Sequence, residues 1–140
     1  MFSKALLSVG VLSTLVFGFT IPVEFNGDWH LRTIDGKDVR KARAIIELNM
    51  YNMKLSGFDA CNRMNGQMIR EDKYRITVPE LQTTRMSCRE SIHSWVSSSL
   101  HEIFKEGFYI TTEDRNGVEG IVIKSPTHEL FFKKMGEPEE

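Results

Sequence analysis

Cysteine is scarce in this sequence: among 140 residues there are only two, Cys61 and Cys88. Two cysteines so far apart lack the paired C-x-x-C spacing of zinc sites, so we expect no metal ion. The sequence also has no P-loop, dinucleotide-binding or EF-hand pattern. We therefore expect no cofactor.

Residues that often serve in catalysis are present, but not in catalytic arrangements. The histidines are predicted to be solvated: His30 on a strand, His128 in a turn, and His93 and His101 on one helix, about 80° apart. Four serines lie on the polar side of the same predicted helix without a G-x-S-x-G elbow. These are Ser94, Ser97, Ser98 and Ser99. The sequence offers no candidate catalytic residue, so we do not expect an enzyme.

A basic excess is missing as well. The chain has 18 Lys and Arg residues against 19 Asp and Glu, with a formal net charge of −1. Nucleic-acid-binding domains usually carry a strong basic patch, so a nucleic-acid partner is not expected. Hydrophobic residues make up 41% and charged residues 26%, the balance of a globular protein of one domain.

The first 20 residues differ from the rest. One early positive charge, Lys4, precedes an uncharged and largely apolar run from Ala5 to Phe19. This pattern predicts a secretory signal peptide over residues 1–20 and export to the periplasm. No A-x-A site marks cleavage, so residues 5–23 could instead remain as an inner-membrane anchor, since a span needs about 20 apolar residues. No cysteine follows the run, so a lipobox is missing. We predict the domain over residues 24–135 and a disordered acidic tail over residues 136–140.

The body of the chain is predicted to consist mostly of short strands. DWHLRTI alternates so that Trp29, Leu31 and Thr33 share one face. By the same criterion AIIELNM, MKLSGF, KYRITV, FYITT, GIVIK and ELFFKK are strand candidates. Asn116-Gly117 predicts a tight turn between FYITT and GIVIK, because both residues tolerate positive φ.

One segment, residues 87–107, has helical spacing. Its apolar side chains recur three or four positions apart, at Ile92, Val96, Leu100, Ile103 and Phe104. Ser87 and Glu90 fit a capping box, and Gly107 fits a C-terminal stop. The predicted fold class is therefore α+β: a mostly antiparallel curled sheet or open barrel of about seven strands, with one helix closing one side.

The role of the two cysteines is open at this point. An even pair in an exported chain usually forms a disulfide, and a Cys61–Cys88 bond would stabilise the fold by roughly 3–4 kcal/mol. The alternative is a reactive thiol at Cys88, in the first helical turn beside Arg85 and Arg89, where a thiolate is favoured. Two buried, unpaired thiols would require a reducing compartment.

Three motifs occur in an order characteristic of one protein family. They are GDWHL, GFDACNRMNG and LQTTRMSC, followed by the predicted helix and a closing LFFKK. In this respect the chain resembles the META domain family, which includes HslJ-like heat-shock proteins. The positions that match the family pattern are Trp29, Leu31, Cys61, Asn62, Gly66, Thr84, Met86 and Cys88. Ala60 departs from it, because the family usually has glycine before the cysteine.

The resemblance implies an envelope domain linked to stress response or antibiotic tolerance, without established catalytic activity. Some relatives are similar in shape to lipid-binding secretin pilots. We therefore expect a non-catalytic, monomeric exported domain that contacts an envelope protein or a lipid-like ligand. If the contact is a lipid-like ligand, some of the nine phenylalanines and seven methionines would line a cavity rather than fill the core. Two alternatives stay open: a thiol-active envelope enzyme using Cys88, and an inhibitor or assembly factor presenting its loops to a protein.

Overall fold

The computed structural model describes residues 22–136. The predicted leader over residues 1–20 lies outside the described residues, as do most of the possible anchor over residues 5–23 and residues 137–140 of the predicted tail. The domain predicted over residues 24–135 lies within them. In the described part of the chain, no helix is long and apolar enough to cross a membrane.

The described residues contain one α-helix, α2 (Ser91–Glu106), and two short 3-10 turns at Val23–Phe25 and Arg40–Ala42. The longer strands are β1 (Gly27–Ile34), β3 (Ile45–Asn49), β4 (Lys54–Phe58), β5 (Arg63–Gln67), β9 (Tyr109–Arg115), β10 (Val118–Lys124) and β11 (Glu129–Lys134). Four strands have two residues each: β2 (Lys37–Asp38), β6 (Ile69–Arg70), β7 (Ile76–Thr77) and β8 (Gln82–Thr83).

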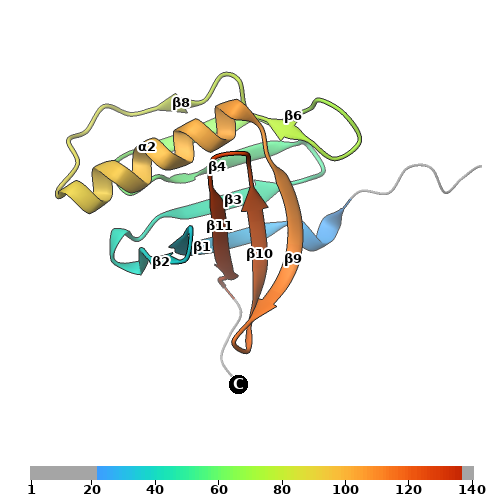
Figure 1. Cartoon of the computed structure of the whole chain (residues 1–140). Coiled ribbons are helices and arrows are strands. Elements are labelled where there is room, and N and C mark those ends of the chain that lie inside the picture. Colours follow the sequence, from blue (N-terminus) through green and yellow to red (C-terminus); the bar gives the residue numbers. More distant parts are fainter. Residues whose placement is uncertain (1–21, 137–140) are drawn as a thin grey trace, which may run out of the picture.

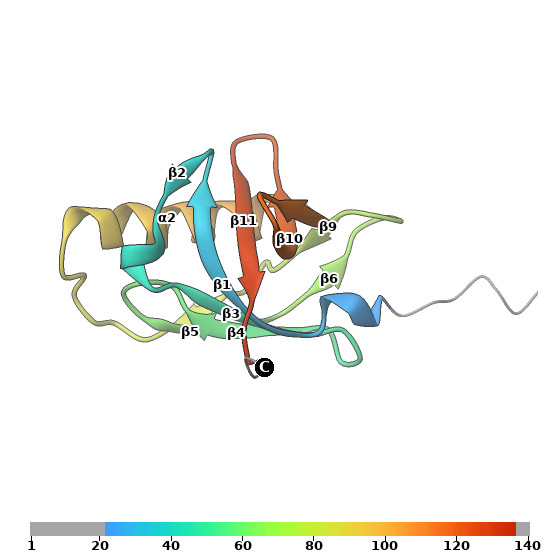
Figure 2. The same ribbon diagram turned by 90° about the horizontal axis from the view of Figure 1, so that it is seen from below.

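Most strands belong to one antiparallel sheet, ordered β8-β5-β4-β3-β1-β11-β10-β9, with β2 paired to β1. β6 and β7 form a separate two-stranded sheet. A bridge between Ile76 of β7 and Phe108, just before β9, brings this small sheet to the far edge of the large one. The sheet therefore curls without closing, and α2 packs against it (Figures 1 and 2). The predicted α+β fold class is confirmed.

The strands differ from the prediction mainly in number. β5 overlaps the end of GFDACNRMNG and is not among the predicted strands. Its outward residues are polar, and its inward residues are Met64 and Gly66, so it lacks the apolar alternation of a typical strand. KYRITV, in contrast, forms only the two-residue β7.

The predicted face of β1 is correct for Trp29 and Leu31, which are buried, but wrong for Thr33. The pairing of β1 with β11 shifts register between Leu31 and Thr33. Because one step of register reverses the direction of a side chain, Ile34 enters the core in place of Thr33.

The helix ends where predicted but begins later. Gly107, with φ of 111°, donates its N–H to the carbonyl of Ile103, as expected for a C-terminal stop. The N-cap is Glu90, without a side-chain capping bond, so the capping box at Ser87 is wrong. The segment before Glu90 is instead held against β5, as described below.

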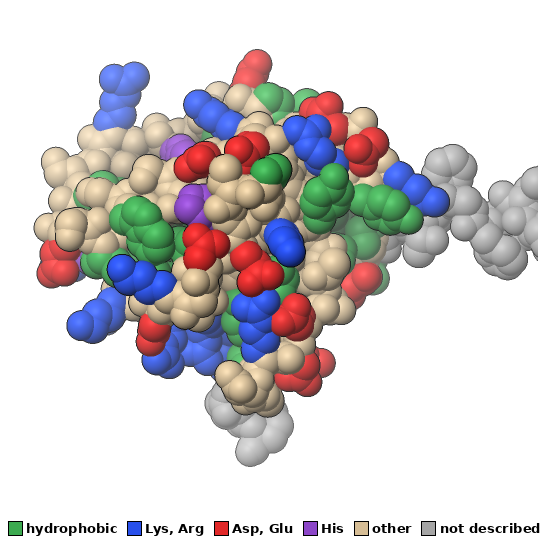
Figure 3. Space-filling view, viewed as in Figure 1, with side chains coloured by type: hydrophobic (Ala, Val, Ile, Leu, Met, Phe, Trp, Pro, Cys, Tyr) green, Lys and Arg blue, Asp and Glu red, His purple; other side chains and the backbone are tan. Residues whose placement is uncertain are grey.

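The core lies between α2 and the curled sheet. The buried stripe of α2 shares one hydrophobic core with Phe108 and Phe132, and the rings of Phe104 and Phe108 pack edge to face at 5.5 Å. On the face of the molecule seen in Figure 3, acidic and basic side chains are interspersed.

Candidate functional site

The two cysteines form a disulfide that joins the loop after β4 to the segment before α2. Cys61 and Cys88 are bonded with their Cα atoms 4.7 Å apart, as predicted for an exported chain. Cys61 is buried and Cys88 is half-buried. Cys88 also lies before the first turn of α2, not within it. The predicted setting for a reactive thiol at a helix N-terminus is therefore wrong.

Asp59 organises the loop that carries Cys61. Its side chain is fully buried, and Oδ1 accepts hydrogen bonds from the backbone N–H groups of Cys61 at 2.8 Å and Asn62 at 2.6 Å. Oδ2 lies 2.7 Å from Nε2 of His101 on α2. Burial alone would raise the pKa of Asp59, but the hydrogen bonds from His101 and from the two backbone N–H groups outweigh burial and lower it. Asp59 is thus a buried carboxylate that ties the loop to the helix.

Ala60 stands where the family usually has glycine, and its backbone conformation shows why glycine is common there. Its φ is 90°, a conformation that glycine adopts freely and that an L side chain adopts only with strain. Ala60 lies between Asp59 and the backbone N–H groups of Cys61 and Asn62, which donate to the Asp59 carboxylate. The glycine common in the family therefore has a backbone reason.

We call residues 79–90, between β7 and α2, the strap. All of its residues are exposed except the half-buried Leu81 and Cys88. It runs along the outer edge of β5, through the short β8, and turns back into α2 (Figures 1 and 2). A segment so exposed depends on specific bonds for its order.

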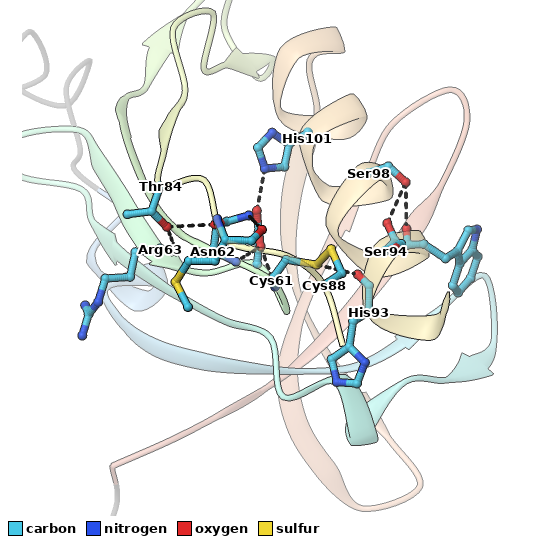
Figure 4. Close-up of a disulfide and its surroundings, with 12 residues drawn as sticks. Cys61, Asn62, Arg63, Thr84, Cys88, His93, Ser94, Ser98 and His101 are labelled. Atoms are coloured by element: carbon cyan, nitrogen blue, oxygen red, sulfur yellow. Dashed lines mark hydrogen bonds and ion pairs between the residues drawn. A yellow bond between two sulfur atoms is a disulfide. The ribbon is translucent and has the colours of Figure 1, made fainter. Parts of the chain in front are cut away.

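Asn62 holds the strap (Figure 4). Its Oδ1 accepts the Thr84 hydroxyl at 2.9 Å and also the backbone N–H of Met86, while Nδ2 donates to the Met86 carbonyl at 3.3 Å. The Thr84 hydroxyl in turn accepts the backbone N–H of Arg63 at 3.1 Å, and the Thr84 N–H donates to the Arg63 carbonyl. The Met86 side chain takes no part in these bonds and is 63% exposed.

The structure brings most of the predicted motif residues together. Cys61, Asn62, Thr84, Met86 and Cys88 form one cluster that joins two loops. Trp29 lies apart, on β1, where it is buried beneath the Lys134 ammonium and donates Nε1–H to the Phe25 carbonyl at 2.9 Å.

Gly66, the remaining motif residue, lies on β5 next to the start of the strap. A Cβ at this position would lie 2.5 Å from Cγ1 of Val78 and 3.3 Å from the carbonyl oxygen of Glu80. Only glycine allows the strap to approach β5 so closely.

The prediction that all histidines are solvated is wrong for His93, whose Nδ1 is buried, and for His101 and His128, which pair with carboxylates. His128 Nδ1 lies 2.7 Å from Asp35 Oδ2, and its Nε2 lies 3.6 Å from Glu102 Oε1, so it links two turns to α2. Sequence spacing could not reveal these pairs, because each joins residues distant in the chain. The only local indication was Asp59, which lies two residues before Cys61 in a stretch rich in turn-forming residues.

In the described part of the chain, the hydrogen-bond partner of the His101 imidazole is Asp59. His101 borders an open hollow of about 500 Å³ together with Ser94, Ser97 and Ser98. The Ser98 hydroxyl donates to helix carbonyls of Ser94 and Trp95 rather than to the imidazole. Across residues 22–136, no group of His, Cys, Asp and Glu is suited to a metal ion. The Asp59–His101 pair joins the loop of Cys61 to α2.

Comparison with known proteins agrees with the fold. Two solved NMR structures have the same fold: one is 22% identical with a TM-score of 0.63, covering 83% of this chain and 96% of its own. The other, from Burkholderia xenovorans, is 16% identical with a TM-score of 0.60, covering 85% of this chain and 90% of its own. No curated protein matches. The sequence profile of the META domain matches residues 22–134, as the motifs predicted. The chain therefore belongs to the META domain family.

Proposed function

We propose that this protein is an exported, non-catalytic binding domain that acts in the periplasm and contacts an envelope protein through the strap. The leader pattern of residues 1–20 supports export, with residues 5–23 as an anchor in the alternative case. The disulfide supports it too, since such bonds persist in oxidising compartments. A role in stress or antibiotic tolerance follows from the family alone.

The ordered but exposed strap is the observation that carries this proposal. A connection of this kind, long and with little secondary structure of its own, usually serves a function when it is ordered. Here a disulfide, the Asn62 side chain and β8 all hold it, yet its outward side chains contribute little to the core. A partner that binds the exposed side chains of the strap would explain why so many contacts hold it in place.

A lipid-like ligand is the second candidate. An open hollow of about 590 Å³ lies on the outer face of the sheet beside the strap, lined in part by Ile45, Phe58 and Met86. An apolar chain could lie there. The thiol-active alternative is weaker, since both cysteines are bonded to each other.

The test is photo-crosslinking from the strap in the native envelope. The full chain carries a photoreactive residue at Met86, and the matched control carries it at Tyr51 in the turn after β3. These side chains are similarly exposed, at 63% and 68%. We expect one discrete protein adduct from position 86, absent from position 51 and lost when excess unlabelled protein is added. Equal labelling at both positions would contradict the proposal, and adducts with lipid alone would favour the apolar ligand.

A further inference from the structure

We infer that the strap is a substrate-like loop that enters the active-site cleft of an endopeptidase specific for arginine. Arg85 would occupy the specificity pocket, and the Arg85–Met86 peptide bond would face the catalytic nucleophile. This inference rests on the proposed function and names its partner class.

From Leu81 to Cys88 the strap contains no turn, bend or helix, so this stretch can lie in a cleft as an extended chain. Outside the two residues of β8 it forms neither helix nor strand, and none of its residues has positive φ. Endopeptidases bind substrates as extended chains, through main-chain hydrogen bonds and alternate side-chain pockets. The segment from Thr84 to Ser87 is exposed throughout, so a cleft can reach it.

Arg85 is free to enter a pocket. Its side chain is exposed, and within residues 22–136 it makes no hydrogen bond or ion pair. Its neighbours Thr84 and Met86 are both fixed by Asn62, which leaves the arginine between two held points. A guanidinium presented in this way can form a bidentate pair with a carboxylate at the base of a pocket.

The bracing suits an inhibitor better than a substrate. Thr84 is bonded to Asn62 and to the backbone of Arg63, and Met86 is bonded to Asn62 through both N–H and carbonyl. This order reduces the entropy lost on binding. On hydrolysis, water would give its OH to the Arg85 carbonyl carbon and its remaining proton to the Met86 nitrogen. Asn62 and the disulfide would keep the new carboxylate and amine side by side, so that the reverse condensation, releasing the same water, remains favourable.

Arg89 provides a matched control. It is exposed like Arg85, but it follows the disulfide at Cys88 and directly precedes the N-cap Glu90. The chain after Arg89 enters α2, so a cleft cannot accommodate an extended segment on that side. Only Arg85 has extended chain on both sides.

The experiment uses the oxidised full chain and trypsin as the probe endopeptidase, with a chromogenic arginine substrate. We expect competitive inhibition with an inhibition constant of roughly 1 µM or below. Arg85→Ala should weaken inhibition roughly 30-fold or more, as for a central hot-spot side chain. Arg85→Lys should retain it, since trypsin accepts both bases, and Arg89→Ala should leave it unchanged.

Asn62→Ala tests the bracing separately. Thermal unfolding first establishes that this variant is folded at the assay temperature. Trypsin should then cleave it after Arg85, so that mass spectrometry after reduction shows fragments 1–85 and 86–140 in a full-length chain, while the wild type stays largely intact.

Three results would overturn the inference: no inhibition by the folded, intact protein, cleavage of the wild type after Arg85 as fast as of the reduced and unfolded chain, or equal effects of Arg85→Ala and Arg89→Ala. If one of these occurs while position 86 still cross-links to an envelope protein, the endopeptidase is rejected and the proposed function stands. If the cross-link also fails, both are rejected.

Discussion

Replacing Cys61 and Cys88 together by alanine removes the covalent link between the two loops and little else. The bond closes a loop with a sequence separation of 27, and the loss of unfolded-state entropy on closing it is worth roughly 3.5 kcal/mol. Cys61 is only 4% exposed, so its truncation adds about 1 kcal/mol for lost packing. We therefore expect the free energy of unfolding to fall by roughly 4–5 kcal/mol, and the melting temperature by about 15–20 °C.

Urea unfolding followed by circular dichroism measures this change, with wild-type protein in a reductant as the control. The m-value should rise, because the unfolded chain without the crosslink exposes more surface. A loss below about 1 kcal/mol would refute the entropic account. A reduced wild type as stable as the oxidised one would do the same.

A double-mutant cycle that combines Asn62→Ala with loss of the disulfide tests whether the two contributions to stability are coupled. In the oxidised protein, Asn62→Ala should cost roughly 1–2 kcal/mol, since its bonds are partly exposed to water. Without the disulfide the strap detaches more readily, so the same substitution should cost less. Additivity within about 0.3 kcal/mol would contradict the coupling.

Three further predictions concern the same loops. Ala60→Gly should raise the free energy of unfolding by about 1 kcal/mol, because it relieves a backbone with φ of 90°; a lower melting temperature would contradict this. Gly66→Ala should lower the free energy of unfolding by roughly 1–3 kcal/mol, because the added Cβ would overlap Val78. Urea unfolding measures this change, and an unchanged midpoint would show that the strap moves away without cost. The lowered pKa of Asp59 means that its carboxylate stabilises the fold fully above its ordinary pKa of 3.8 and loses this contribution as pH falls through the folded-state pKa. The free energy of unfolding of Asp59→Asn should therefore fall less than that of the wild type as the pH drops below 3.8. If the two proteins lose stability in parallel with falling pH, the stabilising role of the Asp59 carboxylate is contradicted.

Features with a local cause could be predicted from the sequence. The buried stripe of α2 follows from apolar residues three and four positions apart, and its end follows from Gly107. The turn between β9 and β10 follows from Asn116-Gly117, where both residues have positive φ. The disulfide followed from the leader pattern together with two cysteines.

Features that depend on distant contacts could not be predicted in this way. Ser87 and Glu90 form a good capping pair locally, but the disulfide at Cys88 and the hydrogen bonds of Asn62 to Met86 hold this segment outside the helix. The pairing of His101 with the buried Asp59 joins residues that are 42 positions apart in the chain. No local pattern encodes either contact.

The sequence by itself determined a strand-rich domain of the META family with one helix, one crosslink and no recognisable catalytic motif, because periodicity, turn residues and cysteine pairing act over short stretches of chain. Only the tertiary structure decided that Asp59 ties the loop of Cys61 to α2, and that Asn62 and the disulfide hold the strap with Arg85 exposed. The reason is that a buried carboxylate and a side-chain amide acquire their roles from the donors that folding brings to them.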